Sequence, residues 1–410
     1  MNQSNRVRAV HCDHRASDDE VYEALQRATN PLIQSWDKLS SAKRIGIKFN
    51  HHWAHDRVVM HAGQRQQLVS DSVARAVLRL LRERTQADLF VIDVGVERPD
   101  PGAPLESCVN LLPVMRAFDV PFIDGNTDAV EWVDVPGGGQ MFRRYPVPRS
   151  TIEADAMISV QKMKNHLFGG VTLCLKNLFG LVPMTPYGRP RAYYHHILRL
   201  PYVFADLGRI FNPALNIIDG LIGQAGQEWG SGEHPRICNT LVAGEHVIST
   251  DACTTHLMGH DPRADWLTEP FHRDRNTLLV ADEGGFGTVN LEEIDFLSEV
   301  NAPVGAFFAS KLDSEERVKS WHRSTAEQAL YYREHSSKFI ERYAGKYILL
   351  QMNEVKWSDP LGNINASRRE LAGDHPDQGM WLKFVDPEEA EGEQYSVYEE
   401  ALRSYASHGW

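Results

Sequence analysis

Cysteine is scarce in this sequence, and long apolar runs are absent. The five cysteines lie far apart and never form a C-x-x-C pair; they are Cys12, Cys108, Cys174, Cys238 and Cys253. This spacing excludes a disulfide framework, and it provides no four-thiolate site for zinc or for an iron–sulfur cluster. No segment approaches the roughly 20 apolar residues of a membrane-spanning helix, and the polar first residues lack a secretory signal. We therefore expect a cytoplasmic protein with no membrane partner.

Positive charge is also in short supply. Lys and Arg number 43 against 55 Asp and Glu, which gives a net charge of −12. The field of such a chain repels nucleic acid, so we expect no nucleic-acid partner. The 410 residues, of which 42% are hydrophobic, are more than one small module needs and are enough to bury a sizeable core.

Short β-rich segments alternate with helical patterns over the first part of the chain. Ser17 and Glu20 form a capping-box sequence, and apolar residues recur once per helical turn over 68–81. Alternation of this kind predicts an α/β fold with a mostly parallel sheet flanked by helices. We expect an α/β core over residues 1–313 and a mainly helical C-terminal extension, packed on that core, over 314–410. The predicted strands are 7–12, 45–49, 89–94, 121–124, 156–161, 214–219, 240–243 and 278–281.

Histidine, with 18 residues, is plentiful, and three imidazoles follow the predicted strand 45–49. They are His51, His52 and His55. Neutral imidazole is a common ligand of transition metals, and a site with three protein ligands keeps positions open for catalysis. The spacing is not that of a zinc protease, because His52 stands where H-E-x-x-H requires Glu. A histidine-rich surface loop is the alternative.

A second polar group lies within the apolar segment 160–180, VQKMKNHLFGGVTLCLKNLFG. Buried polar groups need hydrogen bonds or a ligand. A lysine in such a place can hold an anionic substrate, transfer protons or form a covalent link, although Lys164 could also be an ordinary surface charge. We assign catalytic roles to Lys164, Lys176 and Asn177, and to Asp219, which ends the predicted strand 214–219.

The order of these motifs resembles the uncharacterised bacterial and archaeal family called domain of unknown function 362. KMKNHLFGGVTLCLKNLFG contains the family's Lys-x-His, Gly-x-Thr and Lys-Asn-x-x-Gly patterns, and residues 48–50 resemble its Lys-Pro-Asn with Phe49 in place of Pro. Further similar segments extend the resemblance to about residues 44–262. Membership implies little about the reaction, and the cysteine module of some members is missing here. We assign cofactor binding to four residues of these motifs, Asn50, Gly169, Gly170 and Thr172.

A weaker similarity is to the nickel-pincer lactate racemases. His166, the Gly169-Gly170 pair, Lys176 and the His195-His196 pair follow in the order that those enzymes show. This resemblance implies an isomerase in which Lys176 carries a covalent cofactor. The tyrosine-flanked histidine pair also suits a packed helix face, and Asp251 suits the N-cap of a predicted helix over 252–258 as well as a ligand role.

Taken together, the sequence predicts a metal-dependent enzyme, with an oxidoreductase preferred, that acts on a small anionic substrate. This requires the loop near residue 51 and the glycine loop near residue 170 to meet at one pocket. We expect a divalent transition metal, iron before zinc or nickel. A non-catalytic metal carrier and a racemase-like isomerase stay open as alternatives, as does a homo-oligomer. The candidate ligands are His51, His52, His55, His166, His195, His196 and Asp251.

Overall fold

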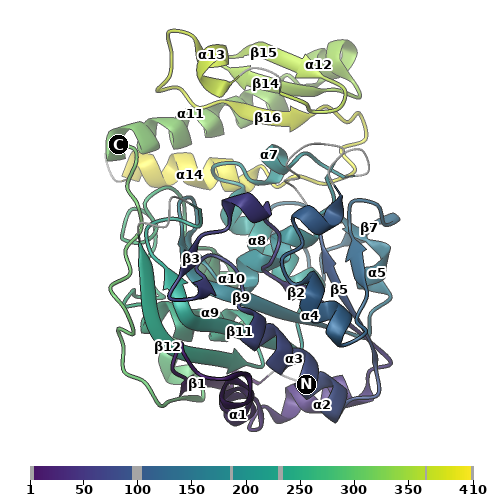
Figure 1. Ribbon diagram of the computed structural model, residues 1–410. Coiled ribbons are helices and arrows are strands. Elements are labelled where there is room, and N and C mark those ends of the chain that lie inside the picture. Colours follow the sequence, from purple (N-terminus) through teal and green to yellow (C-terminus); the bar gives the residue numbers. More distant parts are fainter. Residues whose placement is uncertain (1–3, 95–103, 185–187, 230–233, 365–366, 408–410) are drawn as a thin grey trace.

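The computed structural model describes residues 4–94, 104–184, 188–229, 234–364 and 367–407, and it is built around one nine-stranded sheet (Figure 1). The order is β13-β1-β12-β11-β9-β2-β5-β6, with β10 paired to β9. Strands β11, β9, β2, β5 and β6 run parallel, and β12 is antiparallel to both of its neighbours. The predicted α/β class with a mostly parallel sheet is confirmed. The strands are β1 Val7–His11, β2 Arg44–Phe49, β5 Asp88–Asp93, β6 Phe122–Asp124, β9 Ala156–His166, β10 Gly170–Thr172, β11 Leu215–Gln224, β12 Pro235–Gly244 and β13 Phe296–Ser298.

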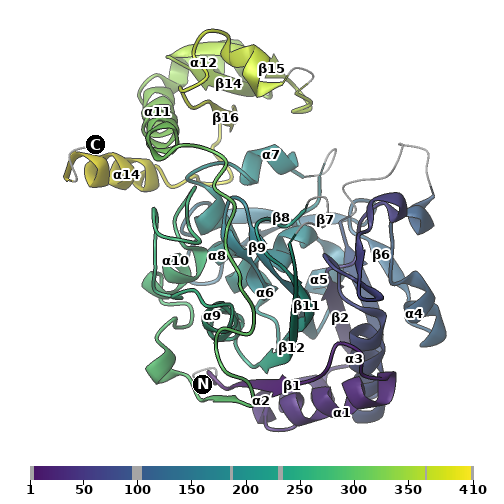
Figure 2. The ribbon, with the colours of Figure 1, turned by 60° about the vertical axis from the view of Figure 1, so that its left-hand side comes forward.

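Helices cover both faces of the sheet (Figure 2). One face packs against α1 Asp18–Thr29, α2 Ile33–Ser41, α3 Asp71–Arg84 and α4 Leu112–Ala117, and the other against α6 Cys174–Asn177, α8 Leu200–Phe211, α9 Val247–Leu257 and α10 Thr277–Glu283. Because successive strand residues point to opposite faces, β5 supplies Val91 to the first core, and Phe90 and Ile92 to the second. The sheet is therefore buried on both sides.

Local signals set several element ends. The capping box forms as predicted, since the Ser17 hydroxyl accepts a bond from the Glu20 amide and the Glu20 carboxylate accepts one from the Ser17 amide. The predicted strand 278–281 is wrong, because these residues lie in α10, which begins where the Asn276 side chain accepts a bond from the Leu278 amide. A short apolar run suits a buried helix as well as a buried strand.

The C-terminal part contains more than helices. A three-stranded antiparallel sheet, in the order β15-β14-β16, packs with the helices and stands beside α7 and α14 in Figure 1. The prediction of a mainly helical extension missed this sheet. The elements are α11 Glu315–Glu334, α12 Ser336–Tyr343, β14 Tyr347–Gln351, β15 Glu354–Asp359, α13 Arg368–Ala372, β16 Trp381–Phe384 and α14 Ser396–Ser407.

Short elements complete the described chain. The pair β7–β8 forms a hairpin around the Gly/Pro-rich turn at 136–139. No described helix combines the length and apolar character needed to cross a bilayer. The remaining elements are β3 Met60–His61, β4 Gln64–Arg65, β7 Val130–Asp134, β8 Arg144–Pro148, α5 Arg149–Ile152, α7 Arg191–Tyr194, and the 3-10 helices η1 His55–Arg57, η2 Leu105–Ser107, η3 Leu178–Leu181 and η4 Leu291–Glu293.

Candidate functional site

A cavity of about 240 Å³ lies where the parallel strands β2 and β5 end, beside β9. Ligands of open α/β sheets bind at this edge, because the loops that follow the strands meet there. The loop after β2 and the helix α6 both contribute to the wall, so residues near 50 and near 176 share one cavity. Its lining consists of Lys48, Asn50, His52, Trp53, Asp93, Val94, Gln161, Lys176, Asn177, Gly180, Arg191, His195, Glu228 and Trp229.

A buried ion pair forms one side of the cavity. The Nζ atom of Lys48 lies 3.0 Å from Oδ2 of Asp93 and donates to Oδ1 of Asn177 at 3.1 Å. The amide of Asn177 donates in turn to the Lys48 carbonyl at 2.8 Å and to the Ser159 hydroxyl at 3.0 Å. The charge of Lys48 is therefore matched by Asp93, and Asn177 holds β2 and β9 in position.

Lys176 is the second lysine of the cavity, and its surroundings differ from those of Lys48. Within the described residues, its amine makes no hydrogen bond or ion pair. Burial lowers the pKa of Lys176 to about 7; the charges of Arg191 and Lys48 act in the same direction, whereas Glu228 and Asp93 oppose the shift. The amine can therefore be neutral or protonated near pH 7.

The position of Lys176 depends on α6, a helix of only four residues. Asp251, which was expected to precede a helix, lies inside α9, and its carboxylate accepts bonds from the amides of Cys174 at 3.0 Å and Leu175 at 2.7 Å. Burial raises the pKa of Asp251 to about 8, against the effect of these two bonds. Asp251 therefore caps α6, and both of its oxygens are used.

Two tryptophans form an aromatic wall of the same cavity. The rings of Trp53 and Trp229 are stacked, with centroids 4.0 Å apart and planes at 12°. Lys164 lies behind this wall, with Nζ 4.4 Å from the centre of the Trp229 ring, and donates to the Gln67 carbonyl at 2.9 Å and to Asn50 Oδ1 at 3.3 Å. Burial holds the pKa of Lys164 well below its usual value. Lys164 thus supports the wall and does not line the cavity.

The predicted glycine loop closes the turn between β9 and β10 and lies outside the cavity lining. The Nδ1 atom of His166 accepts a bond from the Gly169 amide at 2.8 Å, and Thr172 donates to the Asn165 carbonyl at 3.3 Å. Gly170 has φ +73°, and a Cβ there would meet the Phe271 ring at 2.6 Å. Of the four residues assigned to cofactor binding, Asn50 lines the cavity, whereas Gly169, Gly170 and Thr172 shape this turn.

The predicted metal ligands are not brought together. Among the residues that the structure describes, no three His, Cys, Asp or Glu side chains are placed to hold a metal ion. His51 is fully buried against Phe122, His52 lines the cavity and His55 is exposed in η1, because the backbone after β2 turns each imidazole to a different environment.

Of the remaining candidate ligands, only His166 and His195 lie close together, with ring centroids 5.4 Å apart. His195 lines the cavity, whereas Nδ1 of His196 lies 3.1 Å from the Ile197 carbonyl. His166 is buried, and its Nε2 lies 3.4 Å from Oε1 of Glu228. Burial lowers the pKa values of His51, His166 and His195 well below the usual range, so all three rings are neutral near pH 7.

Asp219 does not lie at a strand end as expected. It sits within β11, fully buried, 3.0 Å from Nζ of Lys162, and accepts a bond from the Ser70 amide at 2.8 Å. The strand β11 continues to Gln224, five residues past the predicted end. Asp219 lies outside the cavity lining, and its bonds join β11 to the start of α3.

Several cavity residues escaped the sequence analysis. Asp93 ends the strand LFVID, a position that could have marked it as a candidate, as it did Asp219. Arg191 precedes the tyrosine-flanked histidine pair, which was considered for its imidazoles alone, and Trp53 and Trp229 are 176 positions apart in the chain. Only the fold shows that these residues line one cavity.

Parts of the chain are similar to known proteins. A protein described as thylakoid-associated protein sll1697, from Synechocystis sp., is 27% identical over 158 residues, which are 37% of this chain and 46% of that protein. The match therefore spans less than half of that relative. The lactate racemase apoprotein from Thermoanaerobacterium thermosaccharolyticum aligns with a TM-score of 0.36 and 15% identity, over 62% of this chain and 57% of that one. A similarity at this level carries no functional argument.

A family model matches more than half of the sequence. The model described as "Domain of unknown function (DUF362)" matches residues 47–256, just over half of the chain. The matched region contains β5, β9 and α6, the second half of β2 and nearly all of α9, and so most of the cavity and its supports. The chain belongs to the DUF362 family.

Proposed function

We propose that this chain is an enzyme that binds a small anion in the cavity and uses the amine of Lys176 to move a proton. The observation that carries the proposal is the position of Lys176, which lines the cavity beside Arg191 without a hydrogen bond or ion pair of its own among the described residues. A carboxylate or phosphate would supply the missing negative charge.

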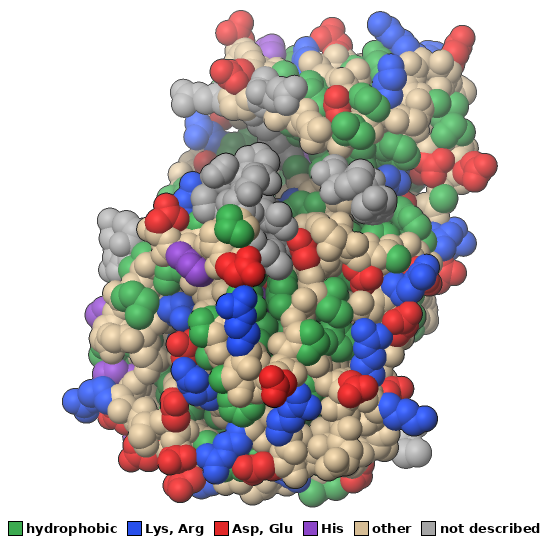
Figure 3. Space-filling model, turned by 45° about the vertical axis from the view of Figure 1, so that its right-hand side comes forward, with side chains coloured by type: hydrophobic (Ala, Val, Ile, Leu, Met, Phe, Trp, Pro, Cys, Tyr) green, Lys and Arg blue, Asp and Glu red, His purple; other side chains and the backbone are tan. Residues whose placement is uncertain are grey.

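The carboxylates of the cavity support this assignment. Asp93 is paired with Lys48, while Glu228 accepts a bond from the Leu167 amide at 2.8 Å and lies near His166. Neither carboxylate pairs with Lys176, so a bound anion would be drawn to the part of the lining that carries this lysine. On the face drawn in Figure 3, by contrast, basic and acidic side chains are interspersed.

The pKa of Lys176 suits proton transfer. A general acid or base works best when its pKa lies near the working pH, and burial lowers that of Lys176 to about 7. Oxidoreductase chemistry and a divalent metal, iron before zinc or nickel, stay predictions, as do a racemase-like isomerase, a metal carrier and a homo-oligomer.

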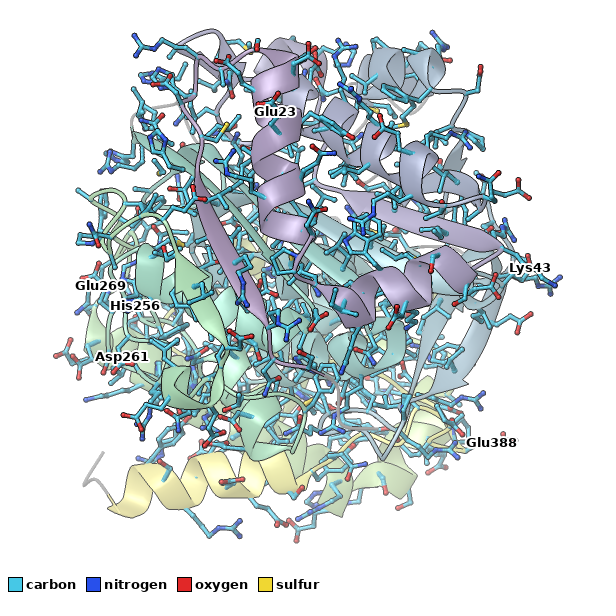
Figure 4. All side chains as sticks on the ribbon, turned by 90° about the horizontal axis from the view of Figure 1, so that it is seen from below. Glu23, Lys43, His256, Asp261, Glu269 and Glu388 are labelled. Atoms are coloured by element: carbon cyan, nitrogen blue, oxygen red, sulfur yellow. The ribbon has the colours of Figure 1, made fainter. Side chains whose placement is uncertain are left out.

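Competitive acetylation tests the proposal. The protein is treated with trace acetic anhydride from pH 5 to 11, with and without lactate, phosphate or neutral acetamide, and each lysine is quantified by peptide mass spectrometry. We expect Lys176 to react with a midpoint of about pH 7, and lactate or phosphate, but not acetamide, to protect it saturably. Lys43, exposed at the edge of the core (Figure 4), is the matched control and should be unaffected.

Arg191→Met identifies the source of anion binding. Loss of a charged hydrogen bond costs about 1.5–3 kcal/mol, so the concentration of lactate or phosphate that protects Lys176 should rise by about tenfold or more. A midpoint near pH 10 for Lys176, or absence of protection by either anion, contradicts the proposal.

A further inference from the structure

We infer that the amine of Lys176 forms an imine with the carbonyl carbon of a small 2-oxo acid whose carboxylate is held at Arg191. This inference rests on the proposed function and names the substrate class of the same cavity. It requires an available nucleophile, an anchor for the carboxylate, a way to move protons and enough space, and each can be examined in the structure.

The nucleophile is the first requirement. The amine of Lys48 has three acceptors, namely Asp93, Asn177 and the Phe49 carbonyl. Lys176 lines the same cavity with no such bond among the described residues, so its lone pair is not committed to a protein partner. Because burial lowers its pKa to about 7, about half of the amine is neutral at pH 7. Desolvation beside another cation is a known way to activate a lysine.

The anchor is the second requirement. In a 2-oxo acid the electrophilic carbon is bonded directly to the carboxylate, so a cation beside the amine places the carbonyl within its reach. Arg191 lines the cavity and is the charged group with the largest effect on Lys176. A guanidinium binds a carboxylate through two parallel hydrogen bonds, which would orient the carbonyl as well as hold it.

The reaction balances with water as its only by-product. The neutral amine adds to the carbonyl carbon, the C=O π electron pair moves to oxygen, and transfer of a proton from nitrogen to oxygen gives a carbinolamine. A proton delivered to the hydroxyl oxygen lets the C–O bond break and water leave while nitrogen donates its lone pair to form the C=N bond, and loss of the N–H proton from the resulting iminium returns the proton that was used. His195 is neutral near pH 7 and lines the cavity with Glu228, so both are placed to relay these protons.

The space suits a small molecule with a flat side chain. A cavity of roughly 150 Å³ accommodates benzene. The present cavity, about 240 Å³, has room for a carboxylate and carbonyl as well as a ring or short chain. The indoles of Trp53 and Trp229 provide the apolar wall for that side chain.

Reductive trapping tests the inference. The full chain is incubated with pyruvate or phenylpyruvate and sodium borohydride, and the intact mass and peptides are then measured. We expect one reduced adduct per chain, located at Lys176 and formed about tenfold or more faster than at Lys43. Lys176→Arg, which keeps the charge but cannot form the imine, should lose the adduct, whereas Lys43→Arg should keep it. Lactate, which lacks the carbonyl, should compete with trapping in the unmodified protein, and this holds even if Lys176→Arg fails to fold.

The outcomes separate this inference from the proposed function. If pyruvate and lactate both protect Lys176 from acetylation but no adduct forms, the imine is overturned while the anion site stands. If neither anion protects Lys176 and no adduct forms, both fail. Adducts spread evenly over surface lysines also overturn the inference.

Discussion

Lys176 lies in surroundings that destabilise the protonated form of its amine. Its pKa falls from 10.5 to about 7 because of burial, and because the charges of Arg191 and Lys48 outweigh those of Glu228 and Asp93. The positive charge of Lys176 also helps to lower the pKa values of Lys164, His166 and His195. A residue kept at such a cost to stability is typical of a functional site.

The cost of burying this lysine can be measured as a pH-dependent increase in the free energy of unfolding of the variant Lys176→Met. Below pH 7 the native lysine is protonated in both the folded and unfolded states, so the penalty is complete; as pH rises from 7 to 10.5, only the unfolded chain keeps the proton, and the penalty disappears. We expect the gain in the free energy of unfolding of Lys176→Met over the native chain to be about 4–5 kcal/mol larger at pH 6 than at pH 10.5, because each unit of the pKa shift corresponds to about 1.4 kcal/mol. Urea unfolding at several pH values measures it, with Lys43→Met as a control that stays within about 0.5 kcal/mol. A gain independent of pH contradicts the shifted pKa.

At the residue scale, the sequence motifs marked several residues that line the cavity, and the roles assigned to them stay predictions. These residues are Asn50, His52, Lys176, Asn177 and His195. The predicted metal ligands do not form one site, because the spacing of histidines in the sequence does not determine where each imidazole points. His51 and His52 are neighbours in the chain, yet only His52 lines the cavity.

At the scale of the element, α6 depends on a side chain from another helix. Asp251 in α9 accepts bonds from both Cys174 and Leu175 at the start of α6, which carries Lys176. Asp251→Ala leaves these buried amides unpaired and should lower the free energy of unfolding by about 2 kcal/mol. Because α6 then loses its fixed position, the acetylation midpoint of Lys176 should also move upward toward that of an exposed lysine.

The isosteric Asp251→Asn separates capping from burial. An amide is uncharged and keeps one acceptor oxygen, but its NH2 group cannot accept the second of the two backbone bonds. We expect Asp251→Asn to lose less stability than Asp251→Ala and to keep part of the low Lys176 midpoint, both measured as for the alanine variant. An equal loss in Asn and Ala contradicts this assignment.

Element boundaries show why Asp251 and Asp219 were misplaced. Helix α9 begins at Val247, four residues before Asp251, and the whole of β11 is buried on both faces, so apolar periodicity does not mark either boundary. In β9 the charged residues Lys162 and Lys164 continue the strand past its apolar part because distant partners, Asp219 and Gln67, satisfy them. The sequence alone does not show which distant residues will become these partners.

At the scale of the molecule, a buried ion cluster fastens the C-terminal part to the core. The carboxylate of Glu393 lies 2.7 Å from Arg199 and 3.0 Å from Lys383 of β16, and accepts a bond from Tyr398 of α14 at 2.6 Å. Arg199 precedes α8 in the core. The residues that meet here are up to 199 positions apart, so sequence reasoning predicted a packed extension without showing what holds it.

Arg199→Met should loosen this attachment. Removing one partner of a buried pair costs about 3–5 kcal/mol, so the opening free energy of β16 amides in hydrogen exchange should fall by that order. Amides of β2 and β9 should keep their protection. Lys356→Ala, which breaks an exposed pair with Glu354, is the control and should change exchange by less than about 1 kcal/mol. Equal losses in β16 and β9 would show that the two parts open together.

The most direct measurement is an NMR titration of the Lys176 amine in protein labelled with ¹³C and ¹⁵N at lysine, assigned by comparison with Lys176→Arg. We expect a pKa of about 7 that rises when lactate or phosphate is added, since a bound anion favours the protonated amine. A pKa near 10.4 that neither anion changes would contradict an anion-binding cavity built around a neutral lysine.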